Sequence, residues 1–273
     1  MVSRTNEQIR EHYDVERSIA DRLRESKPKE RQELYQWAYD ELFSRVPHHP
    51  LLTPKTQAEV REYVEKELAI LGPMIDGNTI FAEIGPGDCA LSMEVAKRVA
   101  KVIAIDVSRE ITSRIDAPAN FELILSDGTS IPVPDESIDV VYSNQLMEHL
   151  HPDDSMRQLE NIFRKLKPGG SYVCITPNRL SGPHDVSRDF DPVATGLHLR
   201  EFTLAELDEI FKESGFRKRR VILRVSRTAL FLPVVPFRLA ESFLGLLSHR
   251  WRKLMTFNRV VRYMLGVKLV GIK

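Results

Sequence analysis

Cysteine and long apolar runs are both scarce in this sequence. Among 273 residues there are only two cysteines, Cys89 and Cys174, which is too few for a disulfide framework. No stretch reaches the roughly 18 uncharged apolar residues of a membrane-spanning helix. The polar first residues also lack the apolar core of a signal peptide. We therefore expect a globular protein in the reducing environment of the cytoplasm.

Charge is balanced overall but unevenly distributed along the chain. The sequence has 39 Lys and Arg against 39 Asp and Glu, whereas the segment 217–273 has 14 basic residues and a single acid, Glu241. Within this segment, residues 238–264 repeat apolar side chains at intervals of three and four, as an amphipathic helix does. Such a basic segment is typical of peripheral contact with an anionic membrane surface, here the inner face. A lid packed on the acidic remainder of the chain fits the pattern equally well.

Residues 1–76 read as three helices, with no strand among them. The first helix keeps its apolar positions at helical spacing up to Pro28, and the second ends before Pro47. The third is expected to begin at Thr53, which can cap the helix, with Pro54 in the first helical position. The aromatic residues of these helices either close over a bound ligand or only pack the helices together; they are Tyr13, Tyr35, Trp37 and Tyr39.

From residue 77 onward, short and nearly continuous apolar segments alternate with helical ones. This alternation is typical of a parallel sheet covered by helices on both faces. The expected architecture is α/β: a helical cap at 1–76, then a doubly wound, Rossmann-like domain at 77–273 with seven mostly parallel strands and a basic helical insertion at about 226–265. The expected strands are 79–84, 102–106, 121–125, 138–143, 171–176, 217–224 and 267–272, and the expected helices are 91–99, 108–115, 154–166 and 203–215.

The first of these strands ends in a glycine loop, FAEIGPGDCAL. Gly85 and Gly87 allow a sharp turn and a close approach of ligand to backbone. Asp106, 21 residues after Gly85, can accept hydrogen bonds from both hydroxyls of a ribose. The loop also fits the G-x-G-x-x-A fingerprint of dinucleotide-binding folds. Glu83 disfavours that interpretation, because its carboxylate would repel a diphosphate; it suits a ligand that carries an ammonium group and a sulfonium centre.

This loop, the acid that closes the second strand, and the segments SDGTSIPVPDESIDVVYSNQLMEHL and FRKLKPGGSYVCITPN resemble the class I S-adenosylmethionine-dependent methyltransferases, in particular methyltransferase type 11. The resemblance covers residues 78–224 and the last strand at 267–272. In one departure, Cys89 and Ala90 occupy the region where the family commonly has a third glycine. The resemblance implies an enzyme that uses S-adenosylmethionine as its cofactor.

The resemblance also implies which residues bind this cofactor. The methionine end would contact Glu83, Gly85 and Gly87. The nucleoside would contact Asp106 through its ribose, Val107 beside the adenine, and Asp127, backed by Gly128, through the adenine amino group. Asn144 and Gln145 would lie beneath the sulfonium. The alternative is an ordinary α/β turn with acids at its strand ends, although ligands of doubly wound folds bind at that edge in any case.

Methyl transfer is an in-line displacement that depends mainly on alignment, so no fixed catalytic triad is expected. A base is needed only when the acceptor is an un-ionised group such as a hydroxyl. The candidate bases are His149, just after the fourth strand, and His184, in the long loop after the fifth strand; packing or capping is the alternative role. No metal site is expected, because Asp189, Asp191 and His198 of that loop show no regular ligand spacing.

The expected function is methyl transfer to a small-molecule, glycan or lipid-linked acceptor, with oxygen favoured as the methylated atom. Two other classes stay open: an NAD-dependent oxidoreductase and a non-catalytic cofactor-binding scaffold. A nucleic-acid substrate is not expected, because the fourth strand is followed by SNQL and not by the N-P-P-aromatic signature of enzymes that methylate base amines. The sequence leaves the acceptor and the oligomeric state open.

Overall fold

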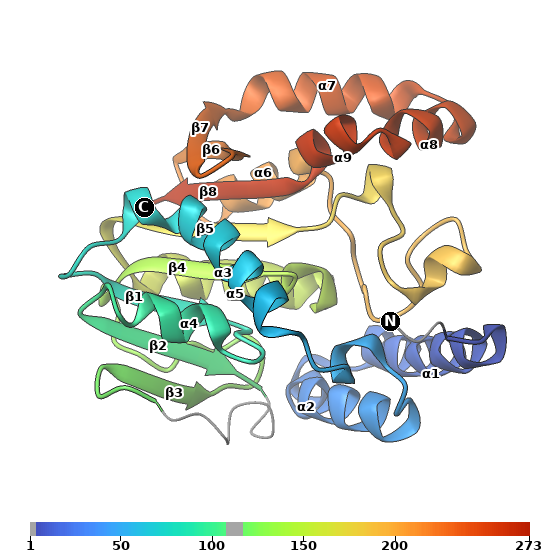
Figure 1. Ribbon diagram of the computed structural model, residues 1–273, viewed down its shortest axis with the longest axis horizontal. Coiled ribbons are helices and arrows are strands. Elements are labelled where there is room, and N and C mark those ends of the chain that lie inside the picture. The colour runs from blue at the N-terminus through green and yellow to red at the C-terminus, as the bar shows by residue number, and fades with distance from the viewer. Residues whose placement is uncertain (1–3, 108–116) are drawn as a thin grey trace.

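The computed structural model describes residues 4–107 and 117–273. Its centre is an eight-stranded sheet in the order β3-β2-β1-β4-β5-β8-β6-β7. Strands β3 to β5 in this order run parallel, whereas β8, β6 and β7 pair antiparallel with their neighbours (Figure 1). The strands are β1 (Ile80–Ile84), β2 (Lys101–Asp106), β3 (Phe121–Leu125), β4 (Ile138–Asn144), β5 (Leu166–Thr176), β6 (Lys218–Val225), β7 (Thr228–Pro233) and β8 (Val267–Ile272). The predicted α/β fold is confirmed.

Both faces of the sheet are buried, which explains the apolar texture of its strands. On β1, Phe81 belongs to the core formed with α3 (Gln57–Leu71) and α4 (Ala90–Val95). The next residue, Ala82, belongs to the opposite core, which includes α5 (Pro152–Lys165) and α6 (Leu204–Glu213). Because consecutive strand residues point to opposite faces, a strand covered on both sides can be apolar at every position. The helix predicted at 108–115 lies outside the described residues.

The prediction of seven strands is wrong, because residues 228–233 form an additional strand, β7. It pairs with β6 in a hairpin that turns at Ser226, whose φ is +57°. The predicted insertion at 226–265 is therefore helical only from Val234, as α7 (Val234–Leu246), α8 (His249–Phe257) and α9 (Arg259–Leu265). Pro233 ends the strand at the outer edge of the sheet, where a residue without a backbone N–H is tolerated. None of the helices in the described ranges is both long and apolar enough to cross a bilayer.

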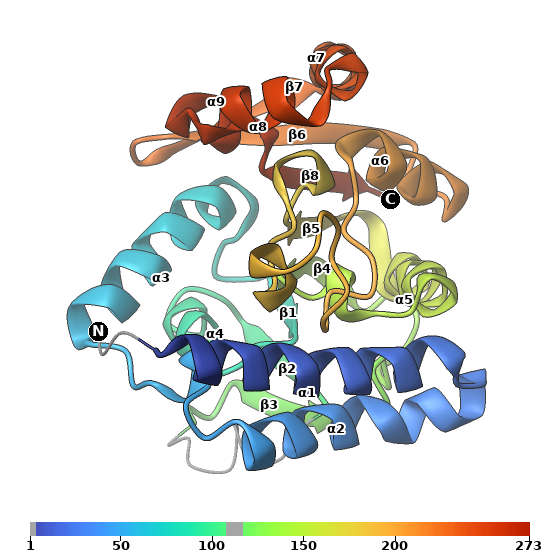
Figure 2. The ribbon, with the colours of Figure 1, turned by 90° about the vertical axis from the view of Figure 1, so that its right-hand side faces the viewer.

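The helices that precede the sheet begin with α1 (Asn6–Glu25) and α2 (Pro28–Arg45). These two helices lie side by side beyond the arrowheads of the parallel strands (Figure 1, Figure 2). Their apolar faces share one continuous core with the sheet. The predicted start of the third helix at Thr53 is wrong, because Thr56 and Glu59 form a capping box that starts α3 at Gln57. The division of the chain at residue 76 stays a prediction.

A buried ion pair fixes α2 against the rest of the fold. Arg31, only 2% exposed, donates from Nε to Asp154 Oδ2 over 2.7 Å. The Tyr35 hydroxyl donates to the same carboxylate oxygen over 2.8 Å and accepts from the backbone N–H of His151. Burying two charges costs desolvation energy that only a good pairing geometry offsets. The network therefore holds α2 in one position above the strand ends.

Candidate active site

A cavity of about 1340 Å³ is lined by the carboxyl ends of β1, β2 and β4 and by residues of α1 and α2. This is the edge where ligands of doubly wound sheets bind. The structure brings together there most of the residues that the sequence pattern indicated, although the role of each stays a prediction. The lining includes Glu83, Gly85, Gly87, Asp106, Val107, Gly128, Asn144, Gln145, His149 and His184.

The glycine loop turns sharply at the end of β1. Gly85 has a φ of +69°, and a Cβ placed on it would lie 3.2 Å from Leu146 Cδ1. A side chain at this position would therefore be strained by its backbone and crowded by its neighbour. The Gly85 N–H donates to the carbonyl of Ile105 on β2, so the turn is tied to the adjacent strand end.

Glu83 places a carboxyl group deep in the wall of the cavity, where it is only 3% exposed. The Ser92 hydroxyl donates to it over 2.5 Å. Burial nevertheless raises the pKa of Glu83 to about 8, since the charged form is poorly solvated. A cationic group of a ligand beside this carboxyl would compensate its charge.

Asp106 ends β2 and lines the cavity together with Val107, whereas Asp127 does not reach it. Asp127 Oδ1 accepts from the N–H groups of Thr129 and Ser130, and Oδ2 accepts from the side-chain amide of Gln32. The carboxylate is thus committed to its own turn and to α2, which leaves the predicted bond to an adenine amino group without structural support.

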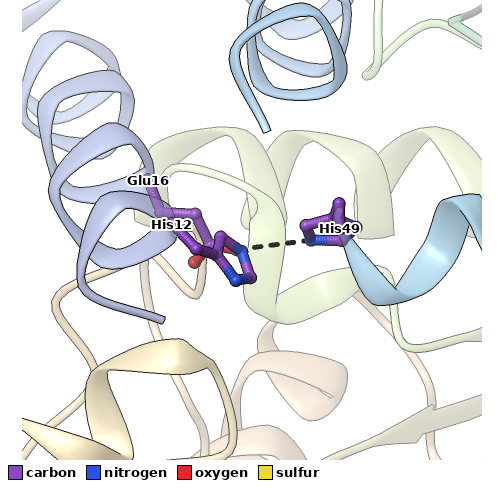
Figure 3. A group of neighbouring side chains, drawn as sticks. All are labelled: His12, Glu16 and His49. Carbon is purple, nitrogen blue, oxygen red and sulfur yellow. Dashed lines mark hydrogen bonds and ion pairs between the residues drawn. The ribbon is translucent and has the colours of Figure 1, made fainter. Parts of the chain in front are cut away.

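A group of side chains that the sequence pattern did not indicate lines the α1 side of the cavity (Figure 3). His12 and Glu16 lie one helical turn apart on α1, and His49 follows α2. His12 Nε2 donates to Glu16 Oε1 over 2.7 Å, and His49 Nε2 lies 3.8 Å from the same oxygen. Burial opposes the charge of Glu16, but the two imidazoles hold its pKa well below the usual range. The spacing of His12 and Glu16 was visible in the sequence; the approach of His49 was not.

Glu16 also connects α1 to the long loop after β5. Its Oε2 accepts from the backbone N–H of Leu197 over 3.1 Å. The approach is close because residue 196 is glycine: a Cβ on Gly196 would lie 2.4 Å from Glu16 Oε2. The predicted loop at the strand ends is therefore anchored against α1 and forms a wall of the cavity.

A second group of side chains consists of Glu148, His149 and His198. The carboxyl of Glu148 is fully buried, and its Oε2 accepts from the Thr176 hydroxyl over 2.9 Å. Burial raises the pKa of Glu148 to about 7. His149 Nδ1 donates to the carbonyl of Leu197 over 3.0 Å, and the rings of His149 and His198 meet edge to face at 4.9 Å. Burial, reinforced by His198, lowers the pKa of His149 to about 3, so its imidazole is neutral at pH 7.

His184, the other predicted base, is engaged within its own loop. Its Nε2 lies 3.1 Å from the Asn178 carbonyl and 3.0 Å from the Ser181 hydroxyl oxygen. Its backbone N–H donates to Glu201. These contacts hold the ring against the loop, so His149 is the better placed of the two candidates to meet a ligand.

The aromatic residues of the N-terminal helices divide into two pairs. Tyr35 and Tyr39 line the cavity. Tyr13 instead packs on Phe190 of the long loop, and Trp37 lies under the guanidinium of Arg22. The first pair can therefore contact a ligand, and the second pair holds the helices in place.

Residues 82–174 match the family described as a methyltransferase domain. The chain is 30% identical over 135 residues to a probable S-adenosylmethionine-dependent methyltransferase of Mycolicibacterium smegmatis, a match that covers 49% of this chain and 50% of that protein. It is also 30% identical over 141 residues to phosphoethanolamine N-methyltransferase 1 of Triticum aestivum, covering 49% of this chain and 27% of that protein. The chain thus spans about half the length, or less, of these curated relatives.

Among solved structures, the fold is similar to phosphoethanolamine N-methyltransferase 2 of Haemonchus contortus in complex with phosphomonomethylethanolamine and S-adenosylhomocysteine. The TM-score is 0.53 at 16% sequence identity, and the match covers 78% of this chain and 56% of that chain. At this identity the likeness is one of fold.

Proposed function

We propose that the chain is a class I S-adenosylmethionine-dependent methyltransferase, with S-adenosylmethionine as cofactor, and that it methylates an oxygen atom of a small or lipid-linked acceptor. The observation that carries this proposal is the buried Glu83 carboxyl beside the glycine loop. A diphosphate would meet a carboxyl there, which disfavours an NAD-dependent oxidoreductase, whereas an ammonium group would neutralise it.

The residues of the cavity fit this cofactor. Glu83 supplies a carboxyl for the ammonium, Gly85 allows close approach to the backbone, and Asp106 ends β2 where a ribose can meet it. When bound, S-adenosylmethionine supplies a methyl group on a sulfonium; this group passes to the acceptor atom, the S–CH3 bonding electrons stay on sulfur, and the acceptor loses a proton. Exclusion of water from this cavity by the bound ligands would favour the loss of charge that accompanies attack by an anion.

The acceptor is proposed to occupy the side of the cavity lined by His149 and Tyr39. The hydrogen bond to Leu197 places the proton of His149 on Nδ1, so Nε2 can accept a hydrogen bond from an acceptor hydroxyl. This supports oxygen as the methylated atom. With a pKa of about 3, however, His149 is a weak base at pH 7, where a general base works best with a pKa near 7. We therefore assign it to orienting the acceptor and not to removing the proton unaided.

The test combines cofactor binding with labelled transfer. The protein should bind S-adenosylmethionine and pass a labelled methyl group from it to a component of fractionated cell extract, as an alkali-labile ester or an ether. Asp106→Ala should abolish labelling by weakening cofactor affinity, whereas His149→Gln should keep affinity and lose transfer. Tight binding of NAD(H) without S-adenosylmethionine would establish the oxidoreductase alternative, and binding without transfer to any fraction would establish the scaffold.

A second proposal concerns where the acceptor is met: the helices α7–α9 rest on the anionic inner face of a membrane. Several large apolar side chains of these helices are each at least 60% exposed, which supports a surface that buries them elsewhere. Other side chains of the helices pack on the domain, such as Glu241, whose carboxylate accepts from the backbone N–H groups of Leu204 and Ala205. Basic residues lie among them and attract anionic lipid, each by about 1 kcal/mol near the surface. The apolar side chains are Leu239, Phe243, Leu246, Trp251, Leu254 and Phe257, and the basic ones are Arg250, Arg252 and Lys253.

Vesicle sedimentation tests this second proposal. The protein should sediment with phosphatidylserine-containing vesicles at low salt and less with phosphatidylcholine alone. The double variant Phe243→Glu, Trp251→Glu should lose binding, whereas Val225→Glu, a similarly exposed apolar position on β6, should keep it. Equal sedimentation of wild type and double variant, or no binding by the wild type, would refute the membrane contact.

A further inference from the structure

Two groups of described residues each contain two histidines and one carboxylate. In each group, one possible metal-binding atom per residue, a ring nitrogen or a carboxylate oxygen, lies within 4.8 Å of the corresponding atoms of the other two residues. The first is His12, Glu16 and His49, and the second is Glu148, His149 and His198. Two imidazoles and a carboxylate form a common ligand set for mononuclear transition-metal sites with an open position. Which group suits a cation depends on which ring nitrogen is free to bind it.

The first group holds its protons on the nitrogens that a cation would need. The Arg4 guanidinium donates to His12 Nδ1 over 2.8 Å, and the Leu51 N–H donates to His49 Nδ1 over 3.1 Å. A neutral imidazole has a single N–H, so in both rings the proton is on Nε2, which faces Glu16 (Figure 3). A cation would have to move these protons onto nitrogens that already face donors. The first group is therefore a carboxylate held by N–H donors.

The second group has the opposite arrangement. His149 Nδ1 faces the carbonyl of Leu197 at 3.0 Å, and His198 Nδ1 faces the carboxylate of Glu201 at 2.7 Å. Both partners accept hydrogen bonds, so the neutral form of each ring carries its proton on Nδ1 and a lone pair on Nε2. Burial opposes the charge of His198, but the carboxylates of Glu201 and Glu148 raise its pKa, so a cation would displace a proton from Nε2 of the charged ring. A carbonyl or carboxylate behind the ring is the usual way in which proteins orient histidines that bind a metal.

The carboxyl of the second group has an unused oxygen. Glu148 Oε1 is one of two buried side-chain atoms in the described part of the chain that have no hydrogen-bond partner. Buried polar atoms are nearly always paired, so such an atom calls for a water or an ion. His149 and His198 both line the cavity, which gives a cation a route to this oxygen.

We propose that Glu148, His149 and His198 bind a divalent first-row transition-metal ion that keeps one coordination position open to the cavity. Bond lengths near 2.1 Å place ligand atoms roughly 3.3 Å apart in a tetrahedral site. The present separations, at most 4.8 Å, require only a modest inward movement of side chains. Glu148 and His149 are adjacent and His198 is distant in the chain, so no regular ligand spacing indicated this site. The proposal therefore departs from the expectation, drawn from the sequence, that the chain binds no metal.

This inference deepens the proposed function and rests on it for the identity of the ligand: an acceptor with a hydroxyl or carboxylate oxygen would bind at the open position. With the cation bound, His149 Nε2 is a metal ligand, and the cation holds the acceptor oxygen in place of the imidazole. A coordinated hydroxyl ionises far more readily than a free one. Its proton leaves to solvent, and the oxygen that remains is an anionic nucleophile directed at the methyl group.

The experiment is zinc titration of the full chain after treatment with a chelator, followed by calorimetry and thermal unfolding. Wild type should bind one Zn2+ per chain and unfold at a higher temperature with it. His198→Gln and Glu148→Gln should lose this binding, whereas His49→Gln, from the first group, and His48→Gln, outside both groups, should retain it. Glu201→Gln removes only the partner of His198 and should weaken zinc affinity 10- to 100-fold, as for other such partners.

Binding of S-adenosylhomocysteine, measured on every variant, shows that each one is folded and tests the proposed function separately. Wild type that binds S-adenosylhomocysteine but no zinc at micromolar concentration would overturn the metal site and leave the methyltransferase intact. Loss of zinc in His49→Gln with retention in His198→Gln would overturn the choice of cluster. Failure to bind S-adenosylhomocysteine at all, with zinc still bound, would count against the proposed function alone.

Discussion

The affinity for S-adenosylmethionine should rise steeply with pH, because Glu83 must ionise before it can hold the ammonium group of the cofactor. Burial raises the pKa of Glu83 to about 8 in the ligand-free protein. A raised pKa means that the carboxyl is protonated at pH 6 in all but about 1% of molecules and ionised in about half of them at pH 8. Over the same range the α-amino group of the cofactor, with an ordinary pKa near 8, loses about half of its charge. The Kd should therefore fall on the order of 25-fold between pH 6 and pH 8.

Calorimetry at constant ionic strength measures both the affinity and the protons exchanged. At pH 7, binding should release about 0.8 proton per cofactor, since Glu83 loses about 0.9 and the cofactor amine takes up about 0.1; this is seen as a dependence of the heat on the ionisation enthalpy of the buffer. Glu83→Gln should bind more weakly at pH 8 and lose the rise of affinity with pH. Asp106→Asn is the matched control: it should weaken binding and keep the slope, because it contacts a part of the cofactor that does not titrate.

A Kd that stays constant from pH 6 to pH 8, or a slope that persists in Glu83→Gln, would refute the contact between Glu83 and the ammonium. The same raised pKa also has a consequence for stability. Because the folded protein retains a proton that the unfolded chain loses above pH 4.5, Glu83 makes the ligand-free protein less stable as pH rises from about 4.5 to 8. Glu83→Gln should remove this loss in urea unfolding.

Three further predictions concern the attachment of the N-terminal helices. Asp154→Ala leaves the charge of Arg31 buried without its main partner and should lower the free energy of unfolding by roughly 3–5 kcal/mol in urea titration, whereas the exposed Asp153→Ala should change it little. Glu16→Gln should destabilise the protein above pH 4.5 and progressively less below it, because a lowered pKa gives stability that is lost as pH falls; a constant difference at all pH values would contradict this. Gly196→Ala should cost about 1–3 kcal/mol from its clash with the carboxylates of Glu16 and Asp185, and combination with Glu16→Ala should recover only the part that is due to Glu16.

The central strands were predictable because the sheet is covered on both faces, so β1, β2 and β4 read as nearly continuous apolar segments. Strand β7 was not, since it lies at the sheet edge, is mostly exposed or half-buried, and ends in Pro233. The start of α3 was misplaced because Thr53 and Thr56 both offer a capping hydroxyl, and only Thr56 has a Glu three residues later.

The residues of the cavity also divide into those that the sequence could indicate and those that it could not. Glu83, Gly85 and Asp106 occupy strand ends, whose position follows from the order of the elements. Asp127 follows the end of β3, but the D-G-T-S turn that it starts binds its carboxylate locally, a signal that was present in the sequence. The histidine groups join residues of α1, of the segments that follow α2 and β4, and of the long loop, and only the folded chain brings these together.

The backbone of a single residue joins the two histidine groups: the N–H of Leu197 donates to Glu16, and its carbonyl accepts from His149. The position of α1 and the orientation of the His149 ring in the acceptor pocket are thereby coupled through these two hydrogen bonds. Any truncation, tag or partner that displaces α1 would leave the residues expected to bind the nucleoside of the cofactor in place, but it would remove the hydrogen bonds that orient the His149 ring. Such a preparation would pass a cofactor-binding assay and still be inert, so binding alone is a poor measure of an intact amino-terminus.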